Sequence, residues 1–229
     1  SAEYRNRVRR EFAALKSIAH VDDAVDRSLH LPDGAGSLVC VSEVHAADEA
    51  TIRLLSHFRA GVTTFPGTFR VTDEGTRRWL RAGLLDVPDR ILFLVYGRTG
   101  RILGHLGFAH ADNAECRMEL DNVIRGVPGV QPGIMAAAVK RLVGWADCTC
   151  APTEIHLRVL DDNHHAIGFY TSLGFTHAGI EPLRRQESHG EIRYVAVPPG
   201  DTEPADLTYA CMRLQRTGDR RCEPLLRSA

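Results

Sequence analysis

Apolar side chains recur at helical intervals in three parts of the chain. Residues 4–19 place Val8 and Phe12 on one face with basic residues between them, a pattern typical of an amphipathic helix. The same period recurs over residues 47–59 and again over residues 134–145. The pattern therefore predicts a leading helix followed by at least two helices that bury one face.

Short apolar runs rich in β-branched and aromatic residues predict strands between these helices. Gly-Arg-Thr-Gly at residues 97–100 is a typical hairpin connection, which makes the middle strands an antiparallel meander. A helix then separates the last two of these strands, and such a crossover makes them parallel and adjacent. The predicted strands cover residues 37–45, 90–96, 101–111, 116–124 and 155–160. This order predicts an α/β fold with a mixed, mostly antiparallel central sheet flanked by helices, preceded by an extra N-terminal helix.

The length of 229 residues suits one large domain. The turn-forming cluster at residues 31–37 marks its start. We therefore predict an N-terminal helical extension at 1–37, one domain at 38–214 and a C-terminal tail at 215–229. No internal repeat interrupts this order.

Composition excludes several classes of partner. The 28 Lys and Arg residues balance 29 Asp and Glu, and no basic stripe is present, so we expect no nucleic-acid partner. Apolar runs such as residues 91–96 are too short to span a bilayer, and the first residues lack the apolar segment of a signal peptide, so we expect a cytoplasmic protein without a membrane partner. The six cysteines show no zinc or disulfide spacing, and we expect no metal.

The most informative stretch is residues 163–175, which read NHHAIGFYTSLGF and follow a strand. Asn163 is a favoured helix N-cap, and Gly174 suits the left-handed residue that ends a helix. The spacing of Asn, Ala-Ile, Phe-Tyr and Leu-Gly-Phe resembles the GNAT superfamily of acyl-CoA-dependent N-acyltransferases. The resemblance covers about residues 38–214 and implies acetyl-CoA, or another short acyl-CoA, as co-substrate.

This resemblance assigns roles within the helix. Tyr170 is implied to protonate the departing CoA thiolate, whereas a lone tyrosine otherwise packs with a satisfied hydroxyl. Asn163 is a candidate CoA contact as well as a cap. Gly168 lowers helix propensity by about 1 kcal/mol relative to alanine, which suggests that a group approaches the backbone there.

A second element is the loop GVQPGIM at residues 129–135. The resemblance implies that its amides bind the CoA diphosphate at a helix N-terminus, which supplies both donors and dipole. Gly133 matches the central glycine of the family pattern, but Val130 and Met135 depart from the outer positions. The implied diphosphate contacts are the amides of Gln131, Gly133, Ile134 and Met135.

The strand at 116–124 carries the candidate base. Glu119 and Asp121 alternate onto one face, with Asn122 on the other, and one carboxylate could take a proton from an ammonium acceptor. A polar strand face that orients substrate is the alternative. The resemblance also implies that the backbone of Val123 and Ile124 holds the acyl carbonyl and the pantetheine, because the family splays its strands there.

The acceptor is less clearly marked. His105 could contact substrate or be a structural histidine, and the segment 60–71 could be a substrate loop that includes Phe65 or a packed connection. The long segment 177–206 could form a lid. Five arginines are candidate contacts for an anionic substrate, although a solvated surface is the alternative for each: Arg70, Arg77, Arg184, Arg185 and Arg193.

We therefore expect an N-acyltransferase that moves an acetyl or short acyl group to the primary amine of a small polar acceptor such as an amino sugar, and that forms a homodimer. Two alternatives remain open. One is a peptide or protein amine as acceptor, and the other is a degenerate module that binds acyl-CoA without catalysis.

Overall fold

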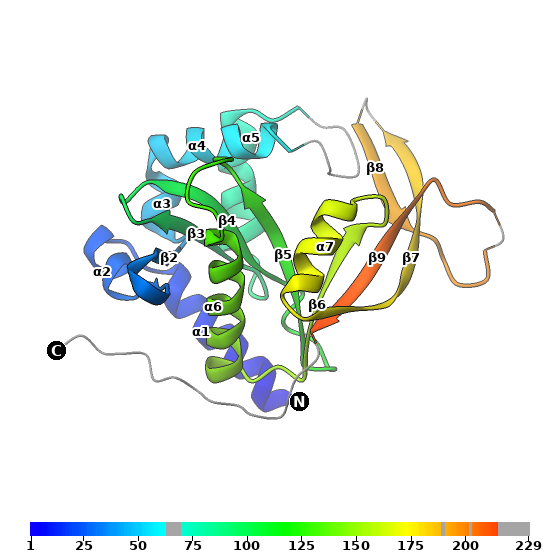
Figure 1. Cartoon of the computed structure of the whole chain (residues 1–229), viewed down its shortest axis with the longest axis horizontal. Helices are drawn as coiled ribbons and strands as arrows, with labels where there is room; N and C mark the ends of the chain where they lie inside the picture. The colour runs from blue at the N-terminus through cyan, green and yellow to red at the C-terminus, as the bar shows by residue number, and fades with distance from the viewer. Residues whose placement is uncertain (63–69, 189–190, 202, 215–229) are drawn as a thin grey trace.

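The computed structural model describes residues 1–62, 70–188, 191–201 and 203–214, whose strands form one mixed sheet with helices on both faces (Figure 1). The strand order is β1-β2-β3-β4-β5-β6-β9-β7-β8. The strands are β1 (Leu29–His30), β2 (Gly36–Cys40), β3 (Ile91–Gly97), β4 (Ile102–Ala109), β5 (Arg117–Arg125), β6 (Glu154–Leu160), β7 (Phe175–Ser188), β8 (Glu191–Ala196) and β9 (Leu207–Leu214). The helices are α1 (Ala2–Lys16), α2 (Val21–Asp26), α3 (Glu43–Ala47), α4 (Glu49–Ala60), α5 (Asp73–Leu80), α6 (Ile134–Thr149) and α7 (His164–Ser172), with a 3₁₀ turn η1 (Pro32–Gly34) and a π-helical turn η2 (Arg81–Leu85).

The predicted class of sheet is confirmed. Neighbouring strands pair antiparallel except β5 and β6, which pair in parallel because α6 crosses between them. The sequence pattern did not predict β1, α2 or the separate strands of the last third of the sheet. The strand predicted at 37–45 was wrong at its end, because β2 ends at Cys40 and residues 43–45 begin α3. Residues 177–206, for which a lid was the prediction, instead contribute most of β7 and all of β8.

Alternation along β3 divides the core between two helical layers. Ile91, Phe93 and Val95 belong to the core cluster that includes α6, whereas Leu92 and Leu94 pack with residues of α4 and α5. This follows from the two-residue period of a strand. The central strands are therefore buried on both faces, which explains their nearly continuous apolar sequence.

Helix α1 is part of the main core. Val8 and Phe12 are fully buried, and the Phe12 ring stacks on Trp145 of α6 with ring centroids 6.2 Å apart. At the end of α1, the buried Lys16 ammonium donates to the carbonyl oxygens of Leu84 and Val87 at 3.2 and 2.6 Å. These bonds satisfy carbonyls at the end of η2 and fix α1 to the other helical layer.

The parallel seam between β5 and β6 is short. Only three residue pairs are in register, from Arg117 with Glu154 to Glu119 with His156. Beyond them β5 continues to pair with β4, while β6 continues to pair with β9. The two halves of the sheet therefore separate past Glu119, and Figure 1 shows α7 beside this opening.

Candidate active site

A cleft of about 210 Å³ lies where β5 and β6 separate. One wall is the segment of β5 from Glu119 to Ile124, and the other is the end of β6 from Arg158 to Leu160. Its remaining lining comes from α7, β9 and the end of α4, through Asn163, Ala166, Tyr170, Tyr209 and Val62. The structure thus brings together six predicted site residues that are far apart in sequence: Glu119, Asp121, Val123, Ile124, Asn163 and Tyr170.

Helix α7 places its tyrosine at the cleft. The Asn163 side chain accepts a hydrogen bond from the Ala166 amide at 3.1 Å, so it caps the helix as its residue type predicts. Gly174 has a φ of 94° and ends the helix in the left-handed region, also as predicted. No atom lies within 4 Å of a Cβ built on Gly168. The described protein atoms therefore do not explain the choice of glycine there.

The ring of Tyr170 lies in an apolar environment. Its ring packs edge-on against Phe169 and Phe175, with centroids 5.2 and 5.8 Å away. Burial raises the pKa of its hydroxyl well above the ordinary value of 10, and the negative charge of Asp121 raises that pKa further. The hydroxyl therefore stays protonated throughout the neutral range, as a proton donor must.

A bulge in β5 reshapes the cleft wall. The register between β4 and β5 shifts after the pair of Gly107 with Asp121, and Asn122 adopts a φ of 53°. Strict alternation predicted Asn122 on the face opposite Asp121, and this was wrong. Its side chain donates to the Asp121 carboxylate at 2.6 Å, because the bulge breaks the alternation.

Both candidate carboxylates form ion pairs with arginine. Glu119 receives two bonds from the Arg158 guanidinium, at 2.8 and 3.1 Å, one on each oxygen. Asp121 receives one bond from Arg90 at 2.8 Å, on the same oxygen that accepts from Asn122. The second oxygen of Asp121 has no described protein donor, whereas both oxygens of Glu119 accept a hydrogen bond from Arg158.

His105 lies behind this wall. Its side chain is fully buried, and its Nδ1 lies 2.8 Å from the carbonyl oxygen of Asn122, at the bulge. Its Nε2 is buried without a hydrogen-bond partner, and burial lowers the pKa of the ring to about 4. His105 does not line the cleft, so the structure suits the structural alternative better than a substrate contact.

The predicted diphosphate loop enters α6. Gly133 caps the helix with a φ of 83°, and Gln131 also has a positive φ of 51°. The Gln131 side chain accepts from the Arg98 amide at 3.1 Å and donates to the Ala35 carbonyl at 2.6 Å, which fixes the loop. The Ile134 amide donates a hydrogen bond to the Gln131 carbonyl oxygen at 3.3 Å. The amides of Met135 and Ala136, in the first helical turn, remain available for an anion.

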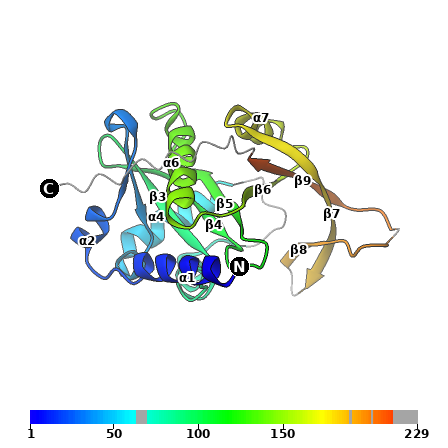
Figure 2. The same ribbon diagram turned by 90° about the horizontal axis from the view of Figure 1, so that it is seen from below.

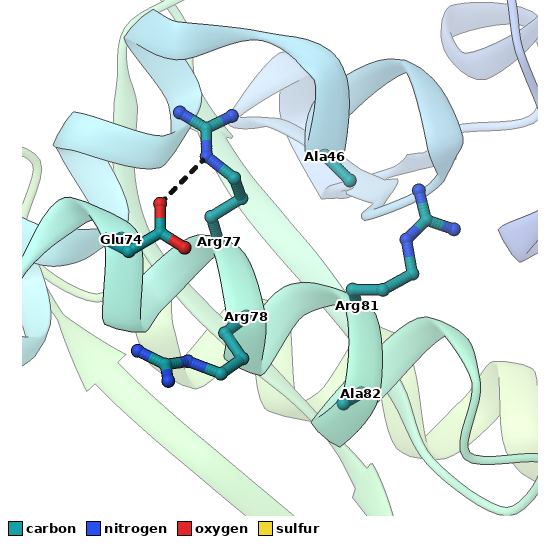
Figure 3. Close-up of a pocket in the computed structure, with 6 residues that line it drawn as sticks. All are labelled: Ala46, Glu74, Arg77, Arg78, Arg81 and Ala82. Carbon is teal, nitrogen blue, oxygen red and sulfur yellow. Dashed lines mark ion pairs between the residues drawn. The ribbon is translucent and has the colours of Figure 1, made fainter.

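The arginines predicted for an anionic substrate lie elsewhere or form other pairs. Figure 3 shows Arg77 at a separate hollow of about 360 Å³ that shares no lining residue with the cleft. Arg77 pairs with Glu49 at 2.7 Å, and Arg184 pairs with Asp201 at 2.6 Å. The arginine that does line the cleft is Arg158, and sequence reasoning missed it.

Phe65 lies outside the described residues. Besides Arg158, the sequence did not single out Arg90 or Tyr209 for the site. For Arg158 a signal existed, because one arginine interrupts the otherwise apolar strand end LRVL. Partners such as Arg90 come from distant segments and carry no local signature.

Within the described residues, no group of three His, Cys, Asp or Glu side chains could hold a metal ion. Among those residues, no helix is long and apolar enough to cross a membrane.

A parallel pair of strands that separates beside two carboxylates and a half-buried tyrosine, next to a glycine-capped helix, is the arrangement that the resemblance to the GNAT N-acyltransferases implies. Residues 62–175 match the family model described as the acetyltransferase (GNAT) family. The chain therefore belongs to the GNAT acetyltransferases, a family that uses acetyl-CoA as co-substrate. A search of curated proteins finds no match.

Several solved structures share the fold. A probable GNAT-family acetyltransferase from Chromobacterium violaceum aligns with a TM-score of 0.57 and 16% identity, over 82% of this chain and 86% of that chain. A chimera of the spermidine N-acetyltransferase from Vibrio cholerae and hSSAT aligns with a TM-score of 0.55 and 13% identity, over 77% of this chain and 93% of that chain. A dodecameric structure of the Vibrio cholerae enzyme aligns with a TM-score of 0.53 and 12% identity, over 73% and 89%. At these identities the likeness concerns the fold.

Proposed function

We propose that this acetyltransferase moves an acetyl or short acyl group from CoA to the primary amine of a small polar acceptor, by direct attack of the amine on the thioester. The observation that carries the proposal is the cleft itself. It brings the unpaired edge of β5, Tyr170 and Asp121 together within about 210 Å³. Direct attack needs positioned groups and a proton path but no protein nucleophile.

The acyl-CoA follows the edge of β5. Past Glu119 this edge has no strand partner on the β6 side, so backbone groups at Val123 and Ile124 are free to bond the acyl carbonyl and the pantetheine. The diphosphate binds the first turn of α6, where Met135 and Ala136 supply amides and the helix dipole favours negative charge. Asn163 contacts CoA in addition to capping α7.

The proton steps fall to Asp121 and Tyr170. An ammonium cannot attack until it loses a proton, and Asp121 takes that proton through its second carboxylate oxygen, directly or through water. Glu119 orients the site together with Arg158, because both of its oxygens are already bonded. Tyr170, which remains protonated, donates to the leaving thiolate.

The charge balance of the cleft favours a polar acceptor such as an amino sugar over a polycation. Each lining carboxylate is paired with an arginine, so the cleft offers little excess negative charge to a polyamine. Hydrogen-bonding groups remain, including the Tyr209 hydroxyl and the Asn122 amide. A homodimer and a cytoplasmic location remain predictions from the sequence.

Release of CoA thiol from acetyl-CoA, measured against a panel of amines, tests the proposal. The panel should contain free and phosphate-linked amino sugars, spermidine, and a lysine peptide, with propionyl-CoA as a second donor. We expect the highest kcat/KM for an amino sugar. Higher kcat/KM for spermidine or for the peptide would overturn the acceptor class, and no thiol release with any amine would overturn amine transfer.

A further inference from the structure

A second cavity, of about 600 Å³, lies on the face of β5, β6 and β9 opposite α7. Alternation places Ile155, Leu157 and Met212 in the core near α7, and the intervening residues of β6 and β9 on the other face. Figure 2 shows no described helix over that face of β6 and β9, which is bordered by the N-terminal end of α1 and by β8. The second cavity therefore lies on a face that no described helix covers.

The second cavity adjoins the active-site cleft. Glu119 and Arg158 line both, so their ion pair forms the shared wall. Arg158 also bonds Glu181 at 2.9 Å on the side of the second cavity. A molecule in the second cavity can thus extend toward the reacting groups along this wall.

Charge is distributed unevenly across the cavity. Near the wall, Arg158 faces the two carboxylates Glu119 and Glu181, which leaves an excess of negative charge. At the far side, Arg213 of β9 forms no ion pair with any described residue. Its cross-strand neighbour in register is His156, whose buried Nδ1 has no hydrogen-bond partner.

A second arginine is only loosely neutralised. Arg117 lies 3.5 Å from the Glu154 carboxylate, a longer contact than the 2.8 Å between Arg158 and Glu119. The cavity therefore holds two incompletely neutralised guanidinium groups: Arg213 on β9, beside the unsatisfied ring nitrogen of His156, and Arg117 on β5, two residues from Glu119. This is the chemistry that binds phosphate or carboxylate groups.

We propose that the second cavity holds an anionic group of the acceptor, so that the preferred acceptor is an amine that also carries a phosphate or carboxylate. This inference rests on the proposed function. The amine end reaches Asp121 in the cleft, past the wall of Glu119 and Arg158, and the anionic end lies in the second cavity between Arg213 and Arg117. Two strand spacings separate Glu119 from Arg213, roughly 10 Å along the sheet, and the long arginine side chain shortens this distance for a ligand.

Calorimetric titration with two matched sugars tests the inference without any need for turnover. Galactosamine 1-phosphate carries both groups, and galactosamine carries only the amine. We expect the phosphorylated sugar to bind at least ten times more tightly to the wild-type protein, and we expect Arg213→Gln and Arg117→Gln each to reduce that ratio by fivefold or more. Arg101→Gln, which removes the same charge from an exposed turn outside the cavity, should leave the ratio unchanged.

Equal binding of the two sugars to the wild-type protein would overturn the inference. So would a ratio that both cavity variants leave unchanged, or one that Arg101→Gln reduces equally, because the preference would then arise from overall charge. The thiol-release assay tests the proposed function independently of this binding measurement. If the protein acetylates amines but does not prefer the phosphorylated sugar, the inference about the second cavity is wrong and the proposed function stands. If it prefers the phosphorylated sugar but acetylates no amine, the proposed function is wrong.

Discussion

The hydrogen bonds of single residues distinguish the two carboxylates of this cleft. Asp121 keeps one oxygen without a described donor, while both oxygens of Glu119 are bonded by Arg158. From residue type alone, Glu119 and Asp121 were equally good candidates for the general base. Their difference arises from arginines on distant segments, which no local pattern in the sequence reveals.

Replacing Tyr170 with phenylalanine removes the proposed proton donor but keeps the ring that packs on Phe169 and Phe175. We expect kcat to fall by roughly ten- to a thousand-fold, within or below the usual effect of a general acid, with the affinity for CoA nearly unchanged. Steady-state kinetics and CoA titration measure the two effects. Full turnover in the variant across the pH range would remove Tyr170 from the mechanism.

The buried ring of His105 makes stability depend on pH. Its pKa is about 4 in the folded protein against 6.5 for an unperturbed histidine, so the folded state binds its proton at lower pH than the unfolded chain does. Its contribution is complete above pH 6.5 and is lost as the pH falls from 6.5 to 4, which amounts to about 3 kcal/mol.

Urea unfolding at a series of pH values checks this expectation. The wild-type protein should lose more unfolding free energy than His105→Gln between pH 6.5 and 4, whereas His20→Gln, at an exposed position, should follow the wild type. Parallel losses in the wild type and His105→Gln would show that other groups cause the acid sensitivity.

At the scale of elements, helix α7 is the clearest success of sequence reasoning. Its cap at Asn163 and its end at Gly174 follow from local chemistry that the sequence displays, whereas the tyrosine at the cleft was implied by the resemblance to the GNAT superfamily. The β5 strand was also predicted, but its bulge was not. A bulge depends on the register with β4, and pairing between strands is a non-local property.

Replacing Gly168 of α7 with alanine separates its effect on helix stability from its effect on the binding of acyl-CoA. No described atom lies within 4 Å of the added methyl group, so the free protein should gain up to about 1 kcal/mol of stability from the better helix former. If acyl-CoA approaches the backbone there, the KM for acetyl-CoA should rise severalfold at the same time. Thermal unfolding and kinetics measure the two effects, and a more stable variant with unchanged KM would show that CoA does not approach this position.

For the whole molecule, the order of elements was sufficient to predict a mixed sheet and the parallel pair of β5 and β6. The last third of the sheet was not predicted, because β7, β8 and β9 lack a clear alternation and even place apolar residues such as Ile180 in solvent. The N-terminal helix was predicted as an extension, but its burial against α6 depends on tertiary packing. The ranges 1–37, 38–214 and 215–229 remain predictions.

The stacking of Phe12 on Trp145 predicts that α1 unfolds together with the sheet. Phe12→Ala removes a fully buried ring and should lower the free energy of unfolding by about 3–5 kcal/mol, in a single transition. Arg10→Ala, at an exposed position of the same helix, should change it by less than about 1 kcal/mol. A separate early transition for α1, followed by circular dichroism and tryptophan fluorescence, would contradict this view.

The short seam between β5 and β6 has a consequence for amide hydrogen exchange. Because only three residue pairs join the strands, the amides of β5 that face β6 beyond Glu119 lack a strand partner in the free protein. They should exchange with deuterium much faster than those of the doubly buried β3, and acetyl-CoA should slow them selectively. Mass spectrometry of peptides covering residues 120–125 measures this difference, and equal protection with and without acetyl-CoA would show that the acyl donor does not occupy the vacant edge. In the proposed complex the ligand takes the place of the strand that β6 no longer provides beyond Glu119.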